Sequence, residues 1–339
     1  MTARTAPYGR VLTAATRSAT AWRQGGSGRG GGGGVAALSL RCRAAAAGDN
    51  GPSTSAPRPP SGASTLNNAT AAAAVWPGLG TPLADLYASV GHHTRVRQHV
   101  NPLKRELQVP VAAPAGGWGD WFEDPAAPLI IDAGCGSGRF ALSLAASAEK
   151  DSNVLGLEIR GALVSRANAW ARAATPALDR RVRFVLANAT VSLPAGLLAT
   201  YPGPLSLACF QFPDPHFKAR HAKRRILQPS TAAAVAAALA PGGRVFLQSD
   251  VLEAAIAMRD AFEAGAGHLL KPCLDLHTES VRAEAAAAVG HTGEDGRPPV
   301  SGWAAAGWLP ANPLGVPTER EVHSLEQGKA VYRCLMVKR

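Results

Sequence analysis

The feature that most constrains the fold is an apolar run that ends in clustered glycines and continues with helical periodicity, "PLIIDAGCGSGRFALSLAASA" at 128–148. This order is typical of a short buried strand, a tight turn and a helix, because glycine adopts backbone conformations that other residues avoid. The alternation repeats in "NVLGLEIRGALVSRANAWARAA" at 153–174. Strands separated by helices pair in parallel, so the pattern predicts an α/β fold with a doubly wound, mostly parallel sheet.

Three further segments extend this sheet along the chain. "VRFVLANAT" and "PLSLACFQFPDP" predict the third and fourth strands, and "STAAAVAAALAPGGRVFLQSD" predicts a helix, a turn and a fifth strand. The late run "AVYRCLMVK" predicts a strand at an antiparallel edge of the sheet. The stretch from Lys271 to Pro310, which contains "HTGEDGRPP", is expected to be a variable insertion.

The glycine turn differs from a dinucleotide-binding fingerprint. Gly134, Gly136 and Gly138 form a G-x-G-x-G pattern. Arg139 stands where G-x-G-x-x-G requires its third glycine, so a nicotinamide dehydrogenase is disfavoured. The pattern resembles instead the first motif of S-adenosylmethionine-dependent methyltransferases.

Polar side chains follow the second and third predicted strands. Glu158 closes the second in "LGLEIR", and Asn188 closes the third in "LANAT". The carboxyl ends of parallel strands share one edge, where a carboxylate can accept from ribose hydroxyls and an amide can contact adenine. We therefore predict a nucleoside site at this rim. The alternatives are an ordinary glycine turn and solvated strand-end charges.

An aspartate between two prolines follows the fourth predicted strand, in "FQFPDPHFKARHAKRR" at 210–225. Pro213 and Pro215 end the strand, because proline has no N–H for the ladder and a restricted φ. Asp214 is thereby held on a stiff loop at the ligand-binding rim. The alternative is that Asp214 only closes a turn. His216, on the same loop, is assigned no role.

A dense basic block comes directly after this loop. Five of the eight residues from Lys218 to Arg225 are Lys or Arg, which indicates a partner that carries many negative charges. Such side chains would neutralise phosphates and orient a nucleic acid without reading its sequence. The alternative is a solvated helix face.

The amino-terminal region has the composition of a targeting segment. Seven arginines precede the first acid, Asp49, among Ala, Ser, Thr and Gly, as in organelle transit peptides. Without them, 28 basic residues face the same 24 acids, and the net charge falls from +11 to about +4. We expect a transit peptide and low-complexity leader at 1–80 and one domain at 81–339. The alternative is a disordered linker.

Cysteine usage and hydropathy exclude several classes of protein. The five cysteines are widely spaced and form no C-x-x-C, which argues against a zinc site or a disulfide framework. No metal ligand set is predicted. No apolar run approaches the ~18 residues that a membrane-spanning helix needs, so we expect a soluble protein.

These motifs together resemble the bacterial-type tRNA (guanine-N7-)-methyltransferases, particularly their cyanobacterial and chloroplast branch. The resemblance covers about 95–339, and "FPDPHFK…KRR" with "PTERE" is its most specific part. "RVRQHVNPL", "DAGCGSGRF", "LGLEIR", "LANAT", "PGGRVFLQSD" and "NPLGVPTERE" also match. It implies a class I (Rossmann-like) fold, S-adenosylmethionine as the methyl donor, and methylation of a variable-loop guanine of tRNA at N7.

The resemblance also assigns residues to roles. The cofactor-binding set is Asp132, Gly134, Gly136, Gly138, Glu158, Asn188 and Ala189. Asp214 falls on the catalytic or guanine-positioning aspartate. The substrate-binding set is Lys218, Asp250, Thr318, Glu319, Arg320 and Glu321. The side chains expected on the tRNA backbone are Arg220, Lys223, Arg224 and Arg225, with Arg95, Arg97 and His99 as an extension of that track.

Three departures from the family pattern are visible. Asp132 stands where many members have Glu, and Asn188 where many have Asp. Both keep their hydrogen-bonding capacity, so we expect them to change affinity more than activity. The pair His216-Phe217 replaces a tryptophan-containing pair of many bacterial members.

The resemblance also bears on partners and location. "RHAKRR" and "NPLGVPTERE" favour the bacterial type, which works without a partner subunit, over the eukaryotic nuclear type, which needs one. We expect a monomer or homodimer that binds tRNA and no membrane. The branch and the Ala/Ser-rich leader favour the chloroplast over the mitochondrion.

Two other functions remain open on the sequence. One is a methyltransferase of this fold that acts on another RNA, a small molecule or a protein. A small-molecule or protein substrate would not need the basic block beside the site. A non-enzymatic RNA-binding module predicts damage to the glycine turn or to Asp214, and both are intact.

Overall fold

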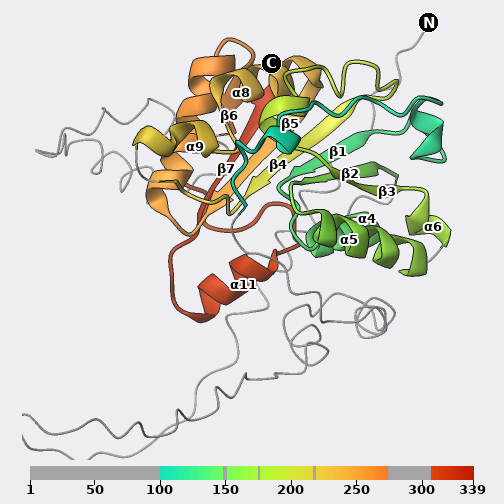
Figure 1. Ribbon diagram of the computed structural model, residues 1–339. Coiled ribbons are helices and arrows are strands. Elements are labelled where there is room, and N and C mark those ends of the chain that lie inside the picture. The colour runs from blue at the N-terminus through green and yellow to red at the C-terminus, as the bar shows by residue number, and fades with distance from the viewer. Residues whose placement is uncertain (1–99, 148–150, 175, 217–218, 274–306) are drawn as a thin grey trace, which may run out of the picture. The chain divides into compact units, whose positions relative to one another are not determined.

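Alternating strands and helices build the protein in the computed structural model, which describes residues 100–147, 151–174, 176–216, 219–273 and 307–339 (Figure 1). All of these residues belong to one compact unit. The predicted leader at 1–80 and the basic residues Arg95 and Arg97, with His99, lie outside the described residues.

Within the described residues, seven strands form one sheet in the order β3-β2-β1-β4-β5-β7-β6. Their bounds are β1 Leu129–Ala133, β2 Asn153–Glu158, β3 Val182–Leu186, β4 Leu205–Gln211, β5 Leu239–Ser249, β6 Leu270–Pro272 and β7 Tyr332–Lys338. Strands β1 to β5 pair in parallel, whereas β7 runs antiparallel to both β5 and β6. The predicted doubly wound, mostly parallel sheet with an antiparallel strand near its edge is confirmed. The late strand is second from that edge, because β6 pairs outside it.

Helices connect the strands and flank the sheet. The α-helices are α4 Arg139–Ser147, α5 Gly161–Ala174, α6 Pro176–Asp179, α7 Ala189–Ser192, α8 Pro229–Ala238, α9 Leu252–Ala266 and α11 Glu319–Glu326. The described ranges also contain three short 3-10 helices, η2 Arg105–Leu107, η3 Trp118–Asp120 and η4 Ala219–Arg224.

The core has two halves, one on each face of the sheet. Neighbouring strand residues point to opposite faces. Ile130 of β1 therefore belongs to the same buried cluster as Trp170 of α5. Ile131 belongs to the cluster that contains Phe262 of α9. Helices α4 and α5 thus cover one face, and α8 and α9 cover the other (Figure 1).

The expected insertion at 271–310 is partly wrong. Lys271 and Pro272 belong to β6, which pairs with β7. Leu309 is buried in the core and its N–H donates to the carbonyl of Arg333. Both ends of the stretch are therefore part of the sheet or its packing, and 274–306 lies outside the described residues.

The parallel pairing places the carboxyl ends of β1 to β4 at one rim. Because the sheet order is β3-β2-β1-β4, the loops after these strands are neighbours in space although they lie far apart in the sequence. Open α/β sheets bind ligands at such a rim.

Candidate active site

Loops at the carboxyl ends of β1 to β4 surround one cavity. It is lined by Gly134 after β1, Glu158 at the end of β2, Asn188 and Ala189 after β3, and Asp214 after β4. The structure therefore brings the predicted nucleoside-binding residues and the predicted base-positioning aspartate around one space.

A second cavity shares part of this wall. Gly134, Arg160, Gln211 and Phe212 line both cavities. The second cavity is also lined by the glycine turn and the start of α11, through Asp132, Gly136, Arg139, Thr318, Glu319 and Arg320. An elongated ligand that occupied both cavities would therefore contact the four residues that line both.

The three glycines of the turn have different tasks. All three have a positive φ, between 56° and 82°. Gly134 and Gly136 line the cavities, and the N–H of Gly136 donates to Glu158 Oε2 at 3.0 Å. A Cβ on Gly138 would lie 2.7 Å from the ring of Phe184, and Gly138 lines neither cavity. Gly138, predicted to bind the cofactor, is therefore required for helix packing behind the turn.

Asp132 is a buried carboxyl at the end of β1, with 3 % of its surface exposed. Its pKa is raised to about 7, mainly by burial; the Gln211 amide opposes the rise, and the nearby Glu158 carboxylate adds to it. The side chain lines the second cavity beside the glycine turn. Asp132 thus ionises near neutral pH, where a cationic ligand would favour its charged form.

The carboxylate of Glu158 is saturated by hydrogen bonds. It accepts from the backbone N–H groups of Gly136, Ile159 and Arg160 at 2.9–3.0 Å. The guanidinium of Arg160 adds two bonds, Nε to Oε1 at 2.9 Å and Nη2 to Oε2 at 3.0 Å. These bonds raise the pKa of Arg160, and Asp214 contributes to the rise. Sequence reasoning missed Arg160, although its place two residues after the strand-end acid was the available signal.

Asn188 is engaged by its own loop. β3 ends two residues earlier, at Leu186, and Asn188 is the N-cap of α7. Its Oδ1 accepts from the backbone N–H and the hydroxyl of Thr190, and its Nδ2 donates to the carbonyl of Pro102 at 3.1 Å. The side chain lines the cavity, and both ends of its amide hold the neighbouring loops that form the wall.

The loop that carries Asp214 is strained at both ends. Phe212 has φ 47° and His216 has φ 42°, in the left-handed region that bulky residues rarely adopt. The N–H of Phe212 donates to the carbonyl of Gln248 at 2.8 Å, which ties the loop to β5. Asp214 itself is exposed and lines the cavity. His216, to which the sequence assigns no role, lines it too. Strain of this kind is typical of functional loops.

The predicted tRNA-backbone residues fall into two pairs. Arg220 and Lys223 are exposed on η4. Arg224 lines the first cavity, and Arg225 donates from Nη2 to the carbonyl of His216 at 3.4 Å. Arg225 therefore supports the Asp214 loop and Arg224 faces the cavity, whereas the first pair faces solvent. Lys218, predicted to bind substrate, lies outside the described residues.

The start of α11 contacts both the glycine turn and β5. Glu319 accepts from Ser137 Oγ at 3.0 Å and forms an ion pair with Arg139. Arg320 forms an ion pair with Asp250, Nη2 to Oδ2 at 2.6 Å, and Ser324 donates to the same oxygen. Two residues predicted to contact substrate, Asp250 and Arg320, thus bind each other and clamp α11 to the rim.

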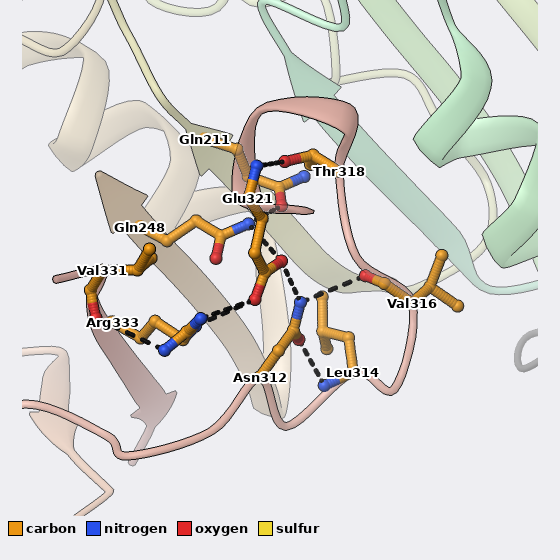
Figure 2. Close-up of polar contacts among 9 residues, drawn as sticks. All are labelled: Gln211, Gln248, Asn312, Leu314, Val316, Thr318, Glu321, Val331 and Arg333. Atoms are coloured by element: carbon orange, nitrogen blue, oxygen red, sulfur yellow. Dashed lines mark hydrogen bonds and ion pairs between the residues drawn. The ribbon is translucent and has the colours of Figure 1, made fainter. Parts of the chain in front are cut away.

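Glu321, also predicted to contact substrate, is buried away from both cavities. Its side chain is 2 % exposed and forms an ion pair with Arg333 of β7 at 2.7 Å. It also accepts from Asn312 Nδ2 at 2.8 Å and from Gln248 Nε2 at 3.2 Å (Figure 2). The prediction of a direct contact is therefore corrected: this carboxylate anchors α11 to the sheet. The hydroxyl of Thr318 caps the helix by accepting from the Glu321 N–H.

Two negative findings concern the described residues only. Among them, no group of three or more His, Cys, Asp or Glu side chains is arranged to hold a metal ion. None of the helices in the described ranges is long and apolar enough to cross a membrane.

Comparisons with known proteins identify the family. Residues 126–279 match the model of the family described as "Putative methyltransferase". A tRNA (guanine-N(7)-)-methyltransferase of Synechococcus elongatus is 39 % identical over 250 residues, which are 72 % of this chain and 96 % of that protein. The enzyme of the same name from a Synechocystis species is 37 % identical over 246 residues, 71 % of this chain and 96 % of that protein.

Solved structures match at low identity. The aminoglycoside resistance methyltransferase NpmB1 aligns at 15 % identity with a TM-score of 0.35, over 62 % of this chain and 87 % of that one. An antibiotic-related methyltransferase aligns at 12 % identity with a TM-score of 0.37, over 69 % and 97 %. The sequence relatives, matched over nearly their whole length, establish the assignment. The chain belongs to the tRNA (guanine-N(7)-)-methyltransferase family.

Proposed function

We propose that this protein transfers the methyl group of S-adenosylmethionine to N7 of a guanine in the variable loop of tRNA. The observation that carries the proposal is the placement of Asp214, on a strained loop, at the same cavity as Glu158 and the glycine turn. A carboxylate that can bind the guanine base and a pocket for the methyl donor therefore lie next to each other.

The residues present fit the donor. Gly134, without a Cβ, allows close approach of a ligand at the wall shared by both cavities. The carboxylate of Glu158 can accept hydrogen bonds from the ribose hydroxyls if they replace part of its contact with Arg160. The carboxylate of Asp132 can bind an ammonium group. When bound, S-adenosylmethionine supplies an electrophilic methyl group on a cationic sulfur.

Asp214 binds and orients the guanine. N7 carries a free lone pair, so no proton has to be removed before attack, and a strong general base is unnecessary. In-line placement is what the reaction needs, and positioning contributes up to ~7–11 kcal/mol in favourable cases. Positive charge develops on the purine as N7 is methylated. A carboxylate that accepts from the N1 and N2 edge therefore binds more strongly as the reaction proceeds.

The basic block holds the tRNA. Its side chains neutralise phosphates, which supplies affinity and orientation but no sequence reading. Selection of the guanine then depends on tRNA shape and on extrusion of the base into the pocket, at a cost of a few kcal/mol. The protein needs no second subunit for these steps and acts as a monomer or homodimer.

Mass spectrometry of an unmodified tRNA transcript, after incubation with the purified chain and S-adenosylmethionine, tests this function. The expected product is one 7-methylguanosine in the variable loop. Donor binding without any base modification would contradict it. A small molecule or protein substrate is the alternative, and it would leave the basic block beside the site without a purpose.

Replacing both Arg220 and Lys223 by Gln is expected to weaken tRNA binding and flatten its salt dependence. Each phosphate contact releases a counterion, so the slope of log affinity against log salt should fall by up to about 2. Filter binding at several salt concentrations measures the slope. Arg172→Gln is the control, because Arg172 is exposed near the carboxyl end of α5, which leads away from the rim. If the slope did not change in the double variant, these two side chains would not contact the tRNA and the block would be an ordinary solvated surface.

Donor affinity is expected to rise with pH through neutrality. Asp132 has a pKa of about 7, and its charged form attracts the cationic donor. Calorimetric affinity for S-adenosylmethionine should therefore be about tenfold higher at pH 8 than at pH 6, and Asp132→Asn should remove this dependence. The stability of the folded state depends on pH in the opposite direction. The unfolded carboxyl ionises near pH 3.8, so the folded state, which retains the proton, loses stability between about pH 4 and 7. A flat affinity profile in the wild type would contradict the role of Asp132.

We also propose that the residues at 1–80 direct the protein to the chloroplast. The acid-free, arginine-containing composition before Asp49 supports import into an organelle. The cyanobacterial source of the similar proteins supports the chloroplast over the mitochondrion. Fusion of the first eighty residues or so to a fluorescent protein tests this, and mitochondrial or cytosolic fluorescence would contradict it.

A further inference from the structure

A line of polar side chains runs from Arg333 of β7 to Gln211 of β4 (Figure 2), and Gln211 lines both cavities. Arg333 donates from Nε and Nη2 to Glu321 Oε1, at 3.1 and 2.7 Å. Glu321 Oε2 accepts from Gln248 Nε2, and the same Nε2 donates to Gln211 Oε1 at 2.6 Å. The fifth member is Asp132, which lines the second cavity together with Gln211 and whose pKa the Gln211 amide lowers.

The charge on Glu321 determines how the two amides are oriented. An ionised carboxylate only accepts hydrogen bonds, so Gln248 must present its NH₂ group to it. Gln248 is fully buried, and turning its amide would place its oxygen against both Glu321 Oε2 and Gln211 Oε1. Gln248 Oε1 has no hydrogen-bond partner among the described residues, so this orientation is retained at the expense of one acceptor.

The orientation of Gln211 follows from that of Gln248. Because Gln211 Oε1 accepts from Gln248, its Nε2 lies at the other end of the amide and faces away from β5. This nitrogen is buried and lacks a hydrogen-bond partner among the described residues, although it lies near enough to Asp132 to favour the charged carboxylate. Gln211 also lines both cavities. A hydrogen-bond donor, the Nε2 group of Gln211, is therefore held at the proposed binding site of the methyl donor.

We propose that Gln211 is a positioning residue of the methyl-donor site, which holds the Asp132 carboxylate charged and turned toward the ligand. Its amide is oriented for this by Glu321, through Gln248. The proposal rests on the proposed function, since it concerns the binding of S-adenosylmethionine. It also gives buried Glu321 an indirect role in donor binding, in place of the direct contact that the sequence predicts.

The surroundings of Asp132 explain why such a donor is useful. Glu158 of β2 lies near the carboxyl and opposes its charge, and Cys135 lies near enough that the charge on Asp132 adds to the rise that burial causes in the pKa of its thiol. Among the described residues, three cations line the same cavity, and each is paired with an acid: Arg139 with Glu319, Arg160 with Glu158, and Arg320 with Asp250. The N–H of Gln211 therefore favours a charge that burial and the neighbouring acid oppose.

Two substitutions of Gln211 test the proposal. Gln211→Glu keeps an oxygen toward Gln248 but places a second oxygen beside Asp132, where the wild type has a donor. Gln211→Met removes the amide and keeps the length of the side chain. Calorimetry with S-adenosylmethionine from pH 6 to 9, with thermal unfolding of each variant, provides the readouts. Gln327→Met is the matched control, because Gln327 is exposed after α11 and does not belong to the line.

Gln211→Glu is expected to weaken affinity for S-adenosylmethionine about tenfold or more and to move the pH midpoint of binding upward, because a second carboxylate beside Asp132 opposes the charge that the Gln211 amide favours. Gln211→Met should weaken it less and move the midpoint upward by a smaller amount, because it removes the favourable N–H without adding a second acid. Gln248→Met should reproduce the effect of Gln211→Met, and the double variant should be no worse than either alone, because both act through one line of bonds. The control should bind like the wild type.

Three results separate the ideas. Wild-type affinity and midpoint in both Gln211 variants, or additive effects of the two methionine variants, would overturn the inference while the proposed function stands. If the wild type bound S-adenosylmethionine but did not methylate tRNA, the proposed substrate would be wrong, and the comparison of the Gln211 variants would remain valid. Failure of the wild type to bind the donor at any pH would overturn both.

Discussion

Replacing Asp214 by Ala is expected to lower the rate of tRNA methylation about 10²–10³-fold, the usual effect of removing one group that stabilises developing charge. Affinity for S-adenosylmethionine should stay near the wild-type value. Asp214 is exposed on the base side of the cavity, whereas donor contacts are expected at Asp132, Glu158 and the glycine turn. Single-turnover methyl transfer and calorimetry measure the two quantities separately.

Two further variants make the Asp214 result specific. Asp214→Asn retains one acceptor oxygen but not the charge, so its activity should lie between the wild type and the alanine variant. Asp179→Ala removes an aspartate from α6 and should change neither quantity. If Asp214→Ala lost donor affinity and turnover to the same degree, Asp214 would belong to the donor pocket, and the proposed contact with guanine would be wrong.

Replacing Glu321 by Ala is expected to lower the free energy of unfolding by about 3–5 kcal/mol, because the buried guanidinium of Arg333 then lacks its partner. In a domain of this size that corresponds to a fall in Tm of about 10 °C. Both side chains of the pair are nearly inaccessible, at 5 % and 2 % exposed. The substitution also leaves Asn312 and Gln248 without their shared acceptor.

Thermal and urea unfolding, followed by circular dichroism, measure the effect of Glu321→Ala. Glu326→Ala, at the exposed end of the same helix, is the control and should change the stability by less than about 0.5 kcal/mol. Replacing both members of the pair, as Glu321→Leu with Arg333→Met, should recover part of the loss, because no buried charge is then unpaired. A loss below about 1 kcal/mol in Glu321→Ala would indicate that water reaches Arg333.

Asp214, on the guanine side of the site, and Glu158, on the methyl-donor side, illustrate how much of the site was predictable. Asp214 follows an apolar run and stands between two prolines, and Glu158 ends another apolar run. Both patterns are local, so they place these residues at strand ends without knowledge of the partners. The positive φ values of Phe212 and His216 were not predictable, because neither residue favours that conformation, and neighbouring contacts such as the bond to Gln248 must impose it.

The sequence by itself determined the alternation of strands and helices, the glycine turn after β1 and the position of Asp214 at the rim. These features depend on hydrophobic periodicity and backbone preferences, which act between residues close in the chain. Only the tertiary structure decided which polar side chains pair with one another. Glu321 meets Gln248, and Glu319 meets Ser137, because the strand order brings distant segments together. A charged side chain has the same local pattern whether it faces a ligand or a buried partner, so its role is settled by what the folded chain places opposite it.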